Sequence, residues 1–335
     1  KKLLFPKHNS SYAHKIDLNF QDNFLETSLM HAIASDNHEM VSLLLKASQK
    51  CDKLQHILSP LNLNIQNRAG WSCLSHASFK GDLHTLQLLL DERIRVPLDL
   101  NLQDESGYTA LMHACLQGHF QCVSLLLSEP SIHVNCQNNG GESALIKASR
   151  QGNLQCVLLL LNHPDTNVDL TDEEGNSALM YLLFHQYTKP NLSMATALFR
   201  RLIEHHRASI HPVNNHQRNL LDYAIKSDQR LEFIKYLLIV GAQASPFLIN
   251  SQRDNNNAAR NICLQWFKLF GFHNNGTISL RLMILRKWVY NTQQPIDIPS
   301  NYPCALCRWP SLEQEIDKIE NILNLQISEN FHYHQ

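Results

Sequence analysis

The sequence predicts an all-α fold, a solenoid of about six helix-turn-helix repeats followed by a small helical module. One observation is a recurring pattern: a polar turn ending in Gly, a short helix of small residues, and a second helix ending in a Leu run, as in residues 101–127. A second is that a Thr or Ser opens each first helix at similar intervals. A third is that one copy is too small to bury a core alone, so neighbouring copies must stack.

The opening residue of each first helix marks the copies. The markers are Thr27, Ser72, Thr109, Ser143, Ser177 and Asn219. Successive markers lie 45, 37, 34, 34 and 42 residues apart. In the first four copies the Leu run follows the marker by 16 residues, at Leu43, Leu88, Leu125 and Leu159. The extra residues of the first two intervals are therefore expected to extend the loop after the second helix. In the fifth copy the extra residues fall around 186–193, where we expect Pro190 to break the helix.

A short polar turn precedes each marker. The clearest turns are residues 67–70, 104–107, 138–141 and 172–175, each beginning with Asp or Asn and ending with Gly. The Asp or Asn side chain can accept hydrogen bonds from the turn, and Gly supplies a positive φ. Leu25 and Gln217 stand at the Gly position of the first and sixth copies. We therefore expect those copies to be atypical end units that close the core.

The repeat pattern stops near residue 245. Helical signals continue in residues 258–272 and 280–290, and Ser311 with Gln314 forms a capping box. One apolar helical face follows, made by Leu312, Ile316, Ile319 and Leu323. The predicted organisation is an N-terminal lead-in (1–18), a repeat domain (19–245) and a C-terminal helical module (246–335).

The composition excludes several classes of protein. A net charge of −1 over 335 residues lacks the basic excess that nucleic acid or an anionic membrane would require of a partner. The apolar runs are too short to span a bilayer, and no signal peptide opens the chain. The nine Cys are odd in number, and four lie in predicted repeat helices, which favours a reducing compartment. We expect a cytoplasmic monomer, and a fragment of a longer chain, since the first residue is Lys.

Residues 104–119, Asp-x-x-Gly-x-Thr-Ala-Leu-x-x-Ala-Cys-x-x-Gly-His, resemble the ankyrin repeat. The resemblance extends over about residues 19–245. One departure is consistent, because the His of the family's Thr-Pro-Leu-His is missing from every copy. The Leu is kept and is expected to lie in the core, at Leu29, Leu74, Leu111, Leu145 and Leu179.

The resemblance implies a protein that binds a partner protein through a concave surface. In this family the turn tips and the exposed positions of the inner helices form that surface. Carried over copy by copy, the candidate partner-binding residues are Arg68, Trp71, His76, Phe79, Lys80, Glu105, Tyr108, His113, Gln117, Glu142, Lys147, Arg150 and Tyr181. Trp71 and Tyr108 are the predicted hot spots, because large rigid rings contribute contact area with little loss of entropy. Replacing both is expected to weaken binding without lowering stability.

No metal, cofactor or catalytic site is predicted. His31, His76 and His113 lie on successive repeats about 10 Å apart, whereas a Zn–N bond is about 2 Å, so one ion cannot gather them. We expect these imidazoles to be solvated or to face the partner, which leaves a pH-sensitive interface open. Cys304 and Cys307 form a lone Cys-x-x-Cys without two further ligands at suitable spacing. No nucleophile with its base and no phosphate-binding Gly loop is recognisable.

Three other interpretations concern the partner and the C-terminal module. Residues 310–323 resemble the start of an F-box-like helix, which would make the chain a ubiquitin-ligase adaptor. Cys263, Cys304 or Cys307 could serve an enzyme site within residues 246–335. The abundance of Asn, Gln, His, Lys and Ile, together with the loose repeats, resembles ankyrin-repeat effectors of intracellular bacteria. That resemblance implies a host protein as partner and the host cytosol as compartment.

Overall fold

The computed structural model describes the repeat region in several segments. The described residues are 16–49, 59–92, 97–184, 189–210, 213–226, Leu237 and Ala242. The chain divides into two compact units, Lys1–Ala208 and Ser209–Gln335. Both predicted loop extensions, the expected boundary near residue 245 and the C-terminal helical module fall on residues outside the described ones.

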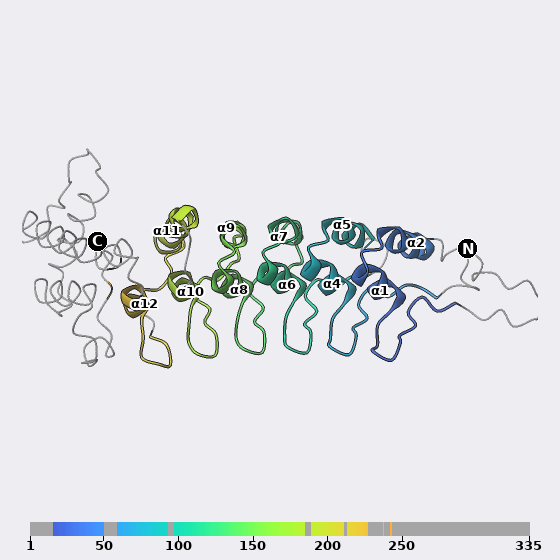
Figure 1. Cartoon of the computed structure of the whole chain (residues 1–335), viewed down its shortest axis with the longest axis horizontal. Coiled ribbons are helices and arrows are strands. Elements are labelled where there is room, and N and C mark those ends of the chain that lie inside the picture. Colours follow the sequence, from blue (N-terminus) through green and yellow to red (C-terminus); the bar gives the residue numbers. More distant parts are fainter. Residues whose placement is uncertain are drawn as a thin grey trace, which may run out of the picture. The chain divides into compact units, whose positions relative to one another are not determined.

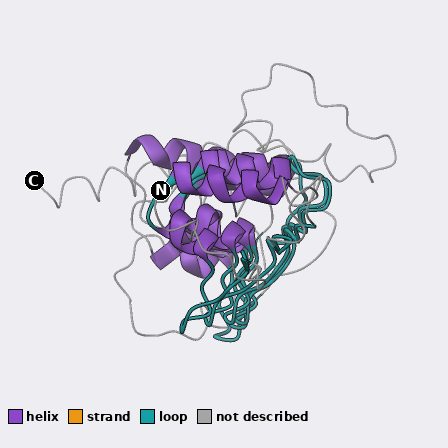
Figure 2. Ribbon diagram, turned by 90° about the vertical axis from the view of Figure 1, so that its right-hand side faces the viewer, coloured by secondary structure: helices purple, strands orange, loops and turns teal. Residues whose placement is uncertain are grey.

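The first unit is built from two rows of helices (Figures 1 and 2). The first helix of each copy lies in one row, formed by α1 (Ser28–Ala34), α4 (Cys73–Lys80), α6 (Ala110–Gln117), α8 (Ala144–Gln151) and α10 (Ala178–Phe184). The second helices form the other row, α2 (His38–Gln49), α5 (Leu83–Glu92), α7 (Phe120–Leu127), α9 (Leu154–Asn162) and α11 (Lys189–Glu204). The second unit contains α12 (Leu220–Lys226). The described part of the chain has no sheet, only isolated bridges within the turns.

The marker residues start the first helices as predicted. The hydroxyl of Thr109 accepts a hydrogen bond from the backbone N–H of Met112 at 3.3 Å, which satisfies a donor that the first turn leaves open. Thr27, Ser72 and Ser143 cap α1, α4 and α8 in the same way. In the first four copies the second helix begins 11 residues after the marker, at His38, Leu83, Phe120 and Leu154. The constant register confirms that these copies share one unit.

The polar turns form fingers that project on one side of the first-helix row (Figure 1). In the third finger, Oδ1 of Asp104 accepts hydrogen bonds from the N–H groups of Ser106 and Tyr108, at 2.9 and 2.8 Å. Gly107 has φ of 80°, and a Cβ there would lie 2.7 Å from the backbone N of Asn139 in the next finger. The turn therefore needs Gly both for its backbone conformation and for close packing between fingers.

The atypical fingers keep the same backbone without Gly. Leu25 has φ of 60° and Gln217 has φ of 59°. A left-handed conformation costs a residue with a side chain about 1–2 kcal/mol. The side-chain oxygens of Asp22 and Asn214 still accept hydrogen bonds from the backbone N–H groups of their turns. The Asp or Asn side chain, and not the Gly, therefore determines the turn.

The core lies between the two rows of helices. The Leu that lies two residues after each marker is at most 2% exposed, at Leu29, Leu74, Leu111, Leu145 and Leu179. The residue that follows it, where the family has His, is also at most 1% exposed, at Met30, Ser75, Met112, Ile146 and Met180. Four of these five are apolar, so the departure from the family pattern exchanges a polar position for additional core.

The prediction that Pro190 breaks the second helix of the fifth copy is wrong. Helix α11 begins at Lys189, so Pro190 lies in its first turn, and the helix has 16 residues where α9 has 9. Proline is tolerated there because the first-turn N–H groups have no acceptor within the helix. Residues 189–193 thus lengthen the helix, while residues 185–188 lie outside the described ones.

Candidate protein-binding surface

The fingers and the outward positions of the first helices form one surface, the inner face. Three rows of equivalent residues cross it. The tip row precedes each marker and comprises Glu26, Trp71, Tyr108, Glu142 and Asn176. The latch row lies four residues after each marker and comprises His31, His76, His113, Lys147 and Tyr181. The rim row lies seven residues after each marker and comprises Ala34, Phe79, Leu116, Arg150 and Phe184.

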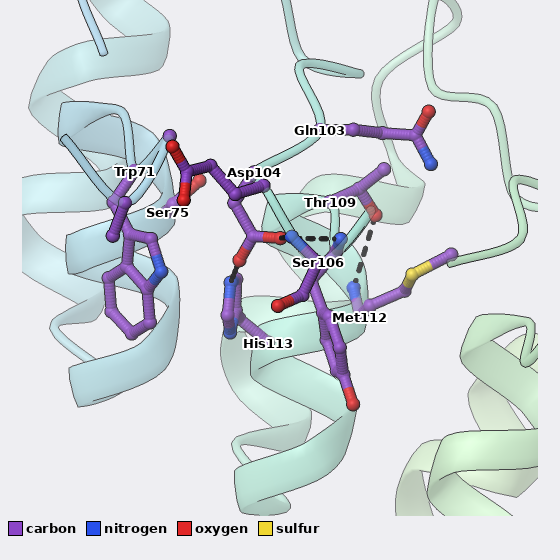
Figure 3. Close-up of polar contacts among 12 residues, drawn as sticks. Trp71, Ser75, Gln103, Asp104, Ser106, Thr109, Met112 and His113 are labelled. Carbon is purple, nitrogen blue, oxygen red and sulfur yellow. Dashed lines mark hydrogen bonds and ion pairs between the residues drawn. The ribbon is translucent and has the colours of Figure 1, made fainter. Parts of the chain in front are cut away.

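The latch row fastens the fingers to the first helices. Nε2 of His113 lies 2.9 Å from Oδ2 of Asp104, the residue whose Oδ1 already holds the finger (Figure 3). His31 makes the same contact with Asp22 at 2.8 Å, and the Tyr181 hydroxyl donates to Asp172. Each bond joins residues nine positions apart. One carboxylate therefore shapes the finger and anchors it to the first helix of its copy.

His113 is buried, so the expectation that its imidazole is solvated is wrong, whereas its contact with a partner stays a prediction. It is 4% exposed, and it lies beside Trp71 (Figure 3). Since the carboxylate of Asp104 must accept, Nε2 carries the proton, and Nδ1 has no partner among the described residues. Burial lowers the pKa of His113, and the hydrogen bond to Asp104 opposes that shift only in part. Protonation would place a buried N–H at Nδ1 without an acceptor.

Four ring systems and one ammonium group form a column across three repeats. The ring centroid of His113 lies 4.4 Å from that of Trp71 and 5.3 Å from that of Tyr108. Phe79 packs edge-on against Trp71 at 5.0 Å, and Nζ of Lys147 lies 4.7 Å from the centre of the Tyr108 ring. Trp71 and Tyr108 are half-buried. Replacing both would therefore remove packing within the protein, so the expectation that this change leaves stability unaffected does not follow from this geometry.

An ionic triad lies beside the column. Glu142 forms ion pairs with Lys147 and, through Oε1 at 2.6 Å, with Arg150, and it accepts from Nδ2 of Asn138 at 3.0 Å. The side chains of Glu142 and Lys147 are 8% and 7% exposed, whereas that of Arg150 is 51% exposed. Burial raises the pKa of Glu142, but the hydrogen bonds from Lys147, Asn138 and Arg150 outweigh it and leave the pKa lowered. The expectation that Glu142 and Lys147 are exposed is wrong. Their opposite charges pair with each other, and this pairing allows both side chains to be buried.

The remaining candidates keep solvent-facing surface in different degrees. Arg68 is exposed and donates to the carbonyl of Asn23 in the preceding finger at 3.1 Å. Lys80 is exposed, and its Nζ donates to the carbonyl of Ala34 at 2.7 Å, at the end of α1. Glu105 and Gln117 are exposed, while His76 and Tyr181 are half-buried. The exposed candidates of the inner face are therefore Arg68, Lys80, Glu105, Gln117 and Arg150, which lie on the same face as the half-buried rings.

Two side-chain ladders that join the fingers were not expected from the sequence. Nε2 of Gln66 donates to the carbonyl of Gly70 in its own finger and, at 2.8 Å, to the carbonyl of Gln103 in the next copy. Gln21, Gln103 and Gln137 repeat this arrangement. A parallel ladder two residues earlier is formed by Asn19, Asn64, Asn101 and Asn135. The recurring Asn-x-Gln was the signal for both.

The buried imidazoles predict a pH-dependent stability. Burial lowers the pKa of His76, His113 and His206, so the unfolded chain binds protons at a higher pH than the folded protein does. The free energy of unfolding should therefore be at its plateau above about pH 6.5, the ordinary pKa of His, and should fall as the pH drops below it. Urea unfolding between pH 5 and 8 measures this. The double change His76→Gln and His113→Gln should reduce the dependence of the free energy of unfolding on pH. The control His133→Gln, at an exposed loop position, should not. An equal pH dependence in the wild type and both variants would contradict the assignment of the effect to His76 and His113.

Four of the five described thiols are buried, Cys73, Cys115, Cys122 and Cys156, and Cys136 is partly exposed. Burial raises the pKa of Cys73 to about 12 and that of Cys122 to about 11. In the described segments no group of three or more His, Cys, Asp or Glu could hold a metal ion, and no helix is long and apolar enough to cross a membrane. Cys263, Cys304, Cys307 and residues 310–323 lie outside the described residues, so the enzyme and adaptor interpretations stay predictions.

Known proteins share this architecture. A family model described as ankyrin repeats (3 copies) matches residues 2–96, 47–138 and 131–199. The crystal structure of EF0377, an ankyrin repeat protein, is 21% identical, with a TM-score of 0.53 over 63% of this chain and 96% of that chain. The ankyrin repeat domain of Bcl-3, a unique member of the IkappaB protein family, is 25% identical, with a TM-score of 0.52 over 65% of this chain and 86% of that chain. None of the curated proteins compared matches the sequence.

Proposed function

Because this chain belongs to the ankyrin repeat family, we propose that it is a scaffold that binds a partner protein through its inner face. Proteins of this family are generally non-enzymatic interaction modules. The observation that carries the proposal is the ring column, since half-buried rings beside exposed polar groups are typical of protein-binding hot spots. The latch bonds and both ladders hold the fingers rigid, which reduces the entropy that binding would cost.

A matched pair of double variants tests the inner face. Gln117→Glu with Gln151→Glu places two carboxylates at exposed ends of α6 and α8, on the inner face. Gln87→Glu with Gln121→Glu makes the same change at exposed positions of α5 and α7, in the other helix row. Surface changes of this kind usually alter stability by less than about 0.5 kcal/mol. We expect the inner-face variant to lose its partner at least about tenfold, a change of 1.4 kcal/mol, and the outer variant to retain it. Equal retention by both would refute the inner face as the binding surface.

We further propose that the partner is a host protein and that the chain acts in the host cytosol. The support is the resemblance in composition and repeat style to effectors of intracellular bacteria. Affinity capture with the full chain and both double variants, from eukaryotic cytosol, tests this. A protein held by the wild type and the outer variant, but not by the inner-face variant, is the expected result. Capture of the same proteins by the inner-face variant would count against a host partner that binds the inner face.

A further inference from the structure

The rim row places one cation between apolar neighbours. Phe79, Leu116, Arg150 and Phe184 occupy the same position of α4, α6, α8 and α10, which pack against one another in that order. Packed helices lie about 8–10 Å apart, so neighbouring rim residues are separated by about that distance. Phe184 is 60% exposed, and Leu116 is partly exposed. A partner lying along this row meets an apolar residue, a guanidinium and another apolar residue in turn.

The guanidinium of Arg150 is held in place with part of its donor set facing solvent. Nη1 donates to Oε1 of Glu142, and the planar group lies 5.5 Å from the centre of the Tyr181 ring. The side chain is nevertheless 51% exposed. A guanidinium has five N–H donors in a fixed fork, and the hydrogen bond from Nη1 to Glu142 uses one of them. Since about half of the side chain is exposed, other donors can meet an acceptor supplied by a partner.

The local charge favours one carboxylate. Lys147 and Glu142 offset each other in the buried part of the triad, and the carboxylate of Asp172, which accepts from the Tyr181 hydroxyl and two backbone N–H groups, also lies close enough to act on Arg150. The half-exposed guanidinium of Arg150 is therefore the group of the triad that presents positive charge to the solvent. A single fork of this kind matches the two oxygens of one carboxylate, while a dianionic phosphate would call for a second exposed cation.

We propose that the rim row binds a partner segment that presents an Asp or Glu side chain between two apolar side chains, one toward Leu116 and one toward Phe184. This rests on the proposed function of the inner face. A separation of about 10 Å corresponds to seven residues of α-helix, which return to the same helix face, or to three residues of polyproline II. The recognised sequence is therefore apolar, acidic, apolar at one of these two spacings.

Selection from a peptide library tests the proposal. Random peptides of about 20 residues, which span two seven-residue spacings, are displayed and selected on the full chain. Enriched peptides are then synthesised and titrated against the wild type, Arg150→Gln, Arg150→Glu and the control Lys46→Glu, which makes the same charge reversal on α2. Thermal unfolding of each variant confirms that it is folded.

The expected peptides carry an acidic residue at one of the two spacings and lose affinity at least about tenfold with Arg150→Glu, less with Arg150→Gln, and not with Lys46→Glu. Replacing the peptide's Asp or Glu by its amide should cause the same loss as Arg150→Gln, with no further loss when both changes are combined. Enriched peptides that lack the acid, or that ignore Arg150 while failing to bind the inner-face variant, would overturn the rim-row proposal alone. Peptides that bind the inner-face variant with unchanged affinity would also contradict the proposed function. A selection that enriches no peptide would overturn the proposal that the partner presents a linear segment.

Discussion

Replacing Glu142 by Gln is expected to lower the free energy of unfolding by about 3–5 kcal/mol, because it leaves a buried ammonium group without its counter-ion. Glu142 and Lys147 are each less than a tenth exposed, and the carboxylate is also the ion-pair partner of Arg150. The amide that replaces it can accept from one of these cations but cannot neutralise either. Lys147 would then have to lose its proton or pull away from the Tyr108 ring and into solvent.

Urea unfolding at pH 7 measures the loss, with Glu105→Gln as the matched control. Glu105 is an exposed carboxylate on the neighbouring finger, so its replacement should change the free energy of unfolding by less than about 0.5 kcal/mol. Adding Lys147→Met to Glu142→Gln should recover most of the loss, because an apolar side chain of similar length removes the unpaired charge. A single variant as stable as the wild type would mean that water reaches the triad.

Leu111→Ala is expected to cost about 2–5 kcal/mol, the transfer free energy of the lost side chain plus the cavity that it leaves. Leu111 is 1% exposed and lies in α6, which packs against α4, α7 and α8. Because α6 packs against helices of its own copy and of both neighbouring copies, closing the cavity would require movement of several repeats. The change should also weaken the coupling between repeats on either side, since a solenoid is stabilised through nearest-neighbour interfaces.

Thermal and urea unfolding measure this effect, and Leu43→Ala provides the control. Leu43 is 53% exposed on α2, and the same truncation there removes little buried surface. The control should stay within about 0.5 kcal/mol of the wild type. A loss of the same size at both positions would show that the effect belongs to the chemistry of the substitution and not to the site.

The repeat register could be predicted because its determinants are local. A capping hydroxyl at Thr109, an Asp four residues before the tip-row residue and a Gly with positive φ are each defined by sequence neighbours. The periodic Leu could be placed for the same reason, since a helix of fixed start has a fixed buried side. The side-chain caps of the first four copies therefore needed no knowledge of what lies beside them. The fifth differs, because the hydroxyl of Ser177 is buried and has no partner among the described residues.

The roles of the inner-face residues could not be predicted, because they depend on neighbouring copies. Lys is a residue type that usually faces solvent, and His is often partly exposed. Trp71 of the preceding copy packs against the imidazole of His113, and Nζ of Lys147 lies over the Tyr108 ring of the copy before its own. A burial decided by the residue one copy away cannot be read from one copy alone. Pro190 misled the prediction for a different reason, since its effect depends on whether a helix begins before or after it.

The glutamine ladder has consequences for how the chain can grow. Each hydrogen bond between copies in this ladder, here called a rung, needs a Gln side chain in one copy but only a backbone carbonyl in the following copy. Every residue supplies such a carbonyl. Thr171, which replaces Gln in the fifth copy, can therefore receive the rung from Gln137. A gene duplication that inserted another Gln-bearing copy before it would keep the ladder unbroken on both sides. The ladder therefore fixes the register between fingers without fixing the number of copies, whereas the specific ring and ion contacts of the inner face tie particular copies to each other.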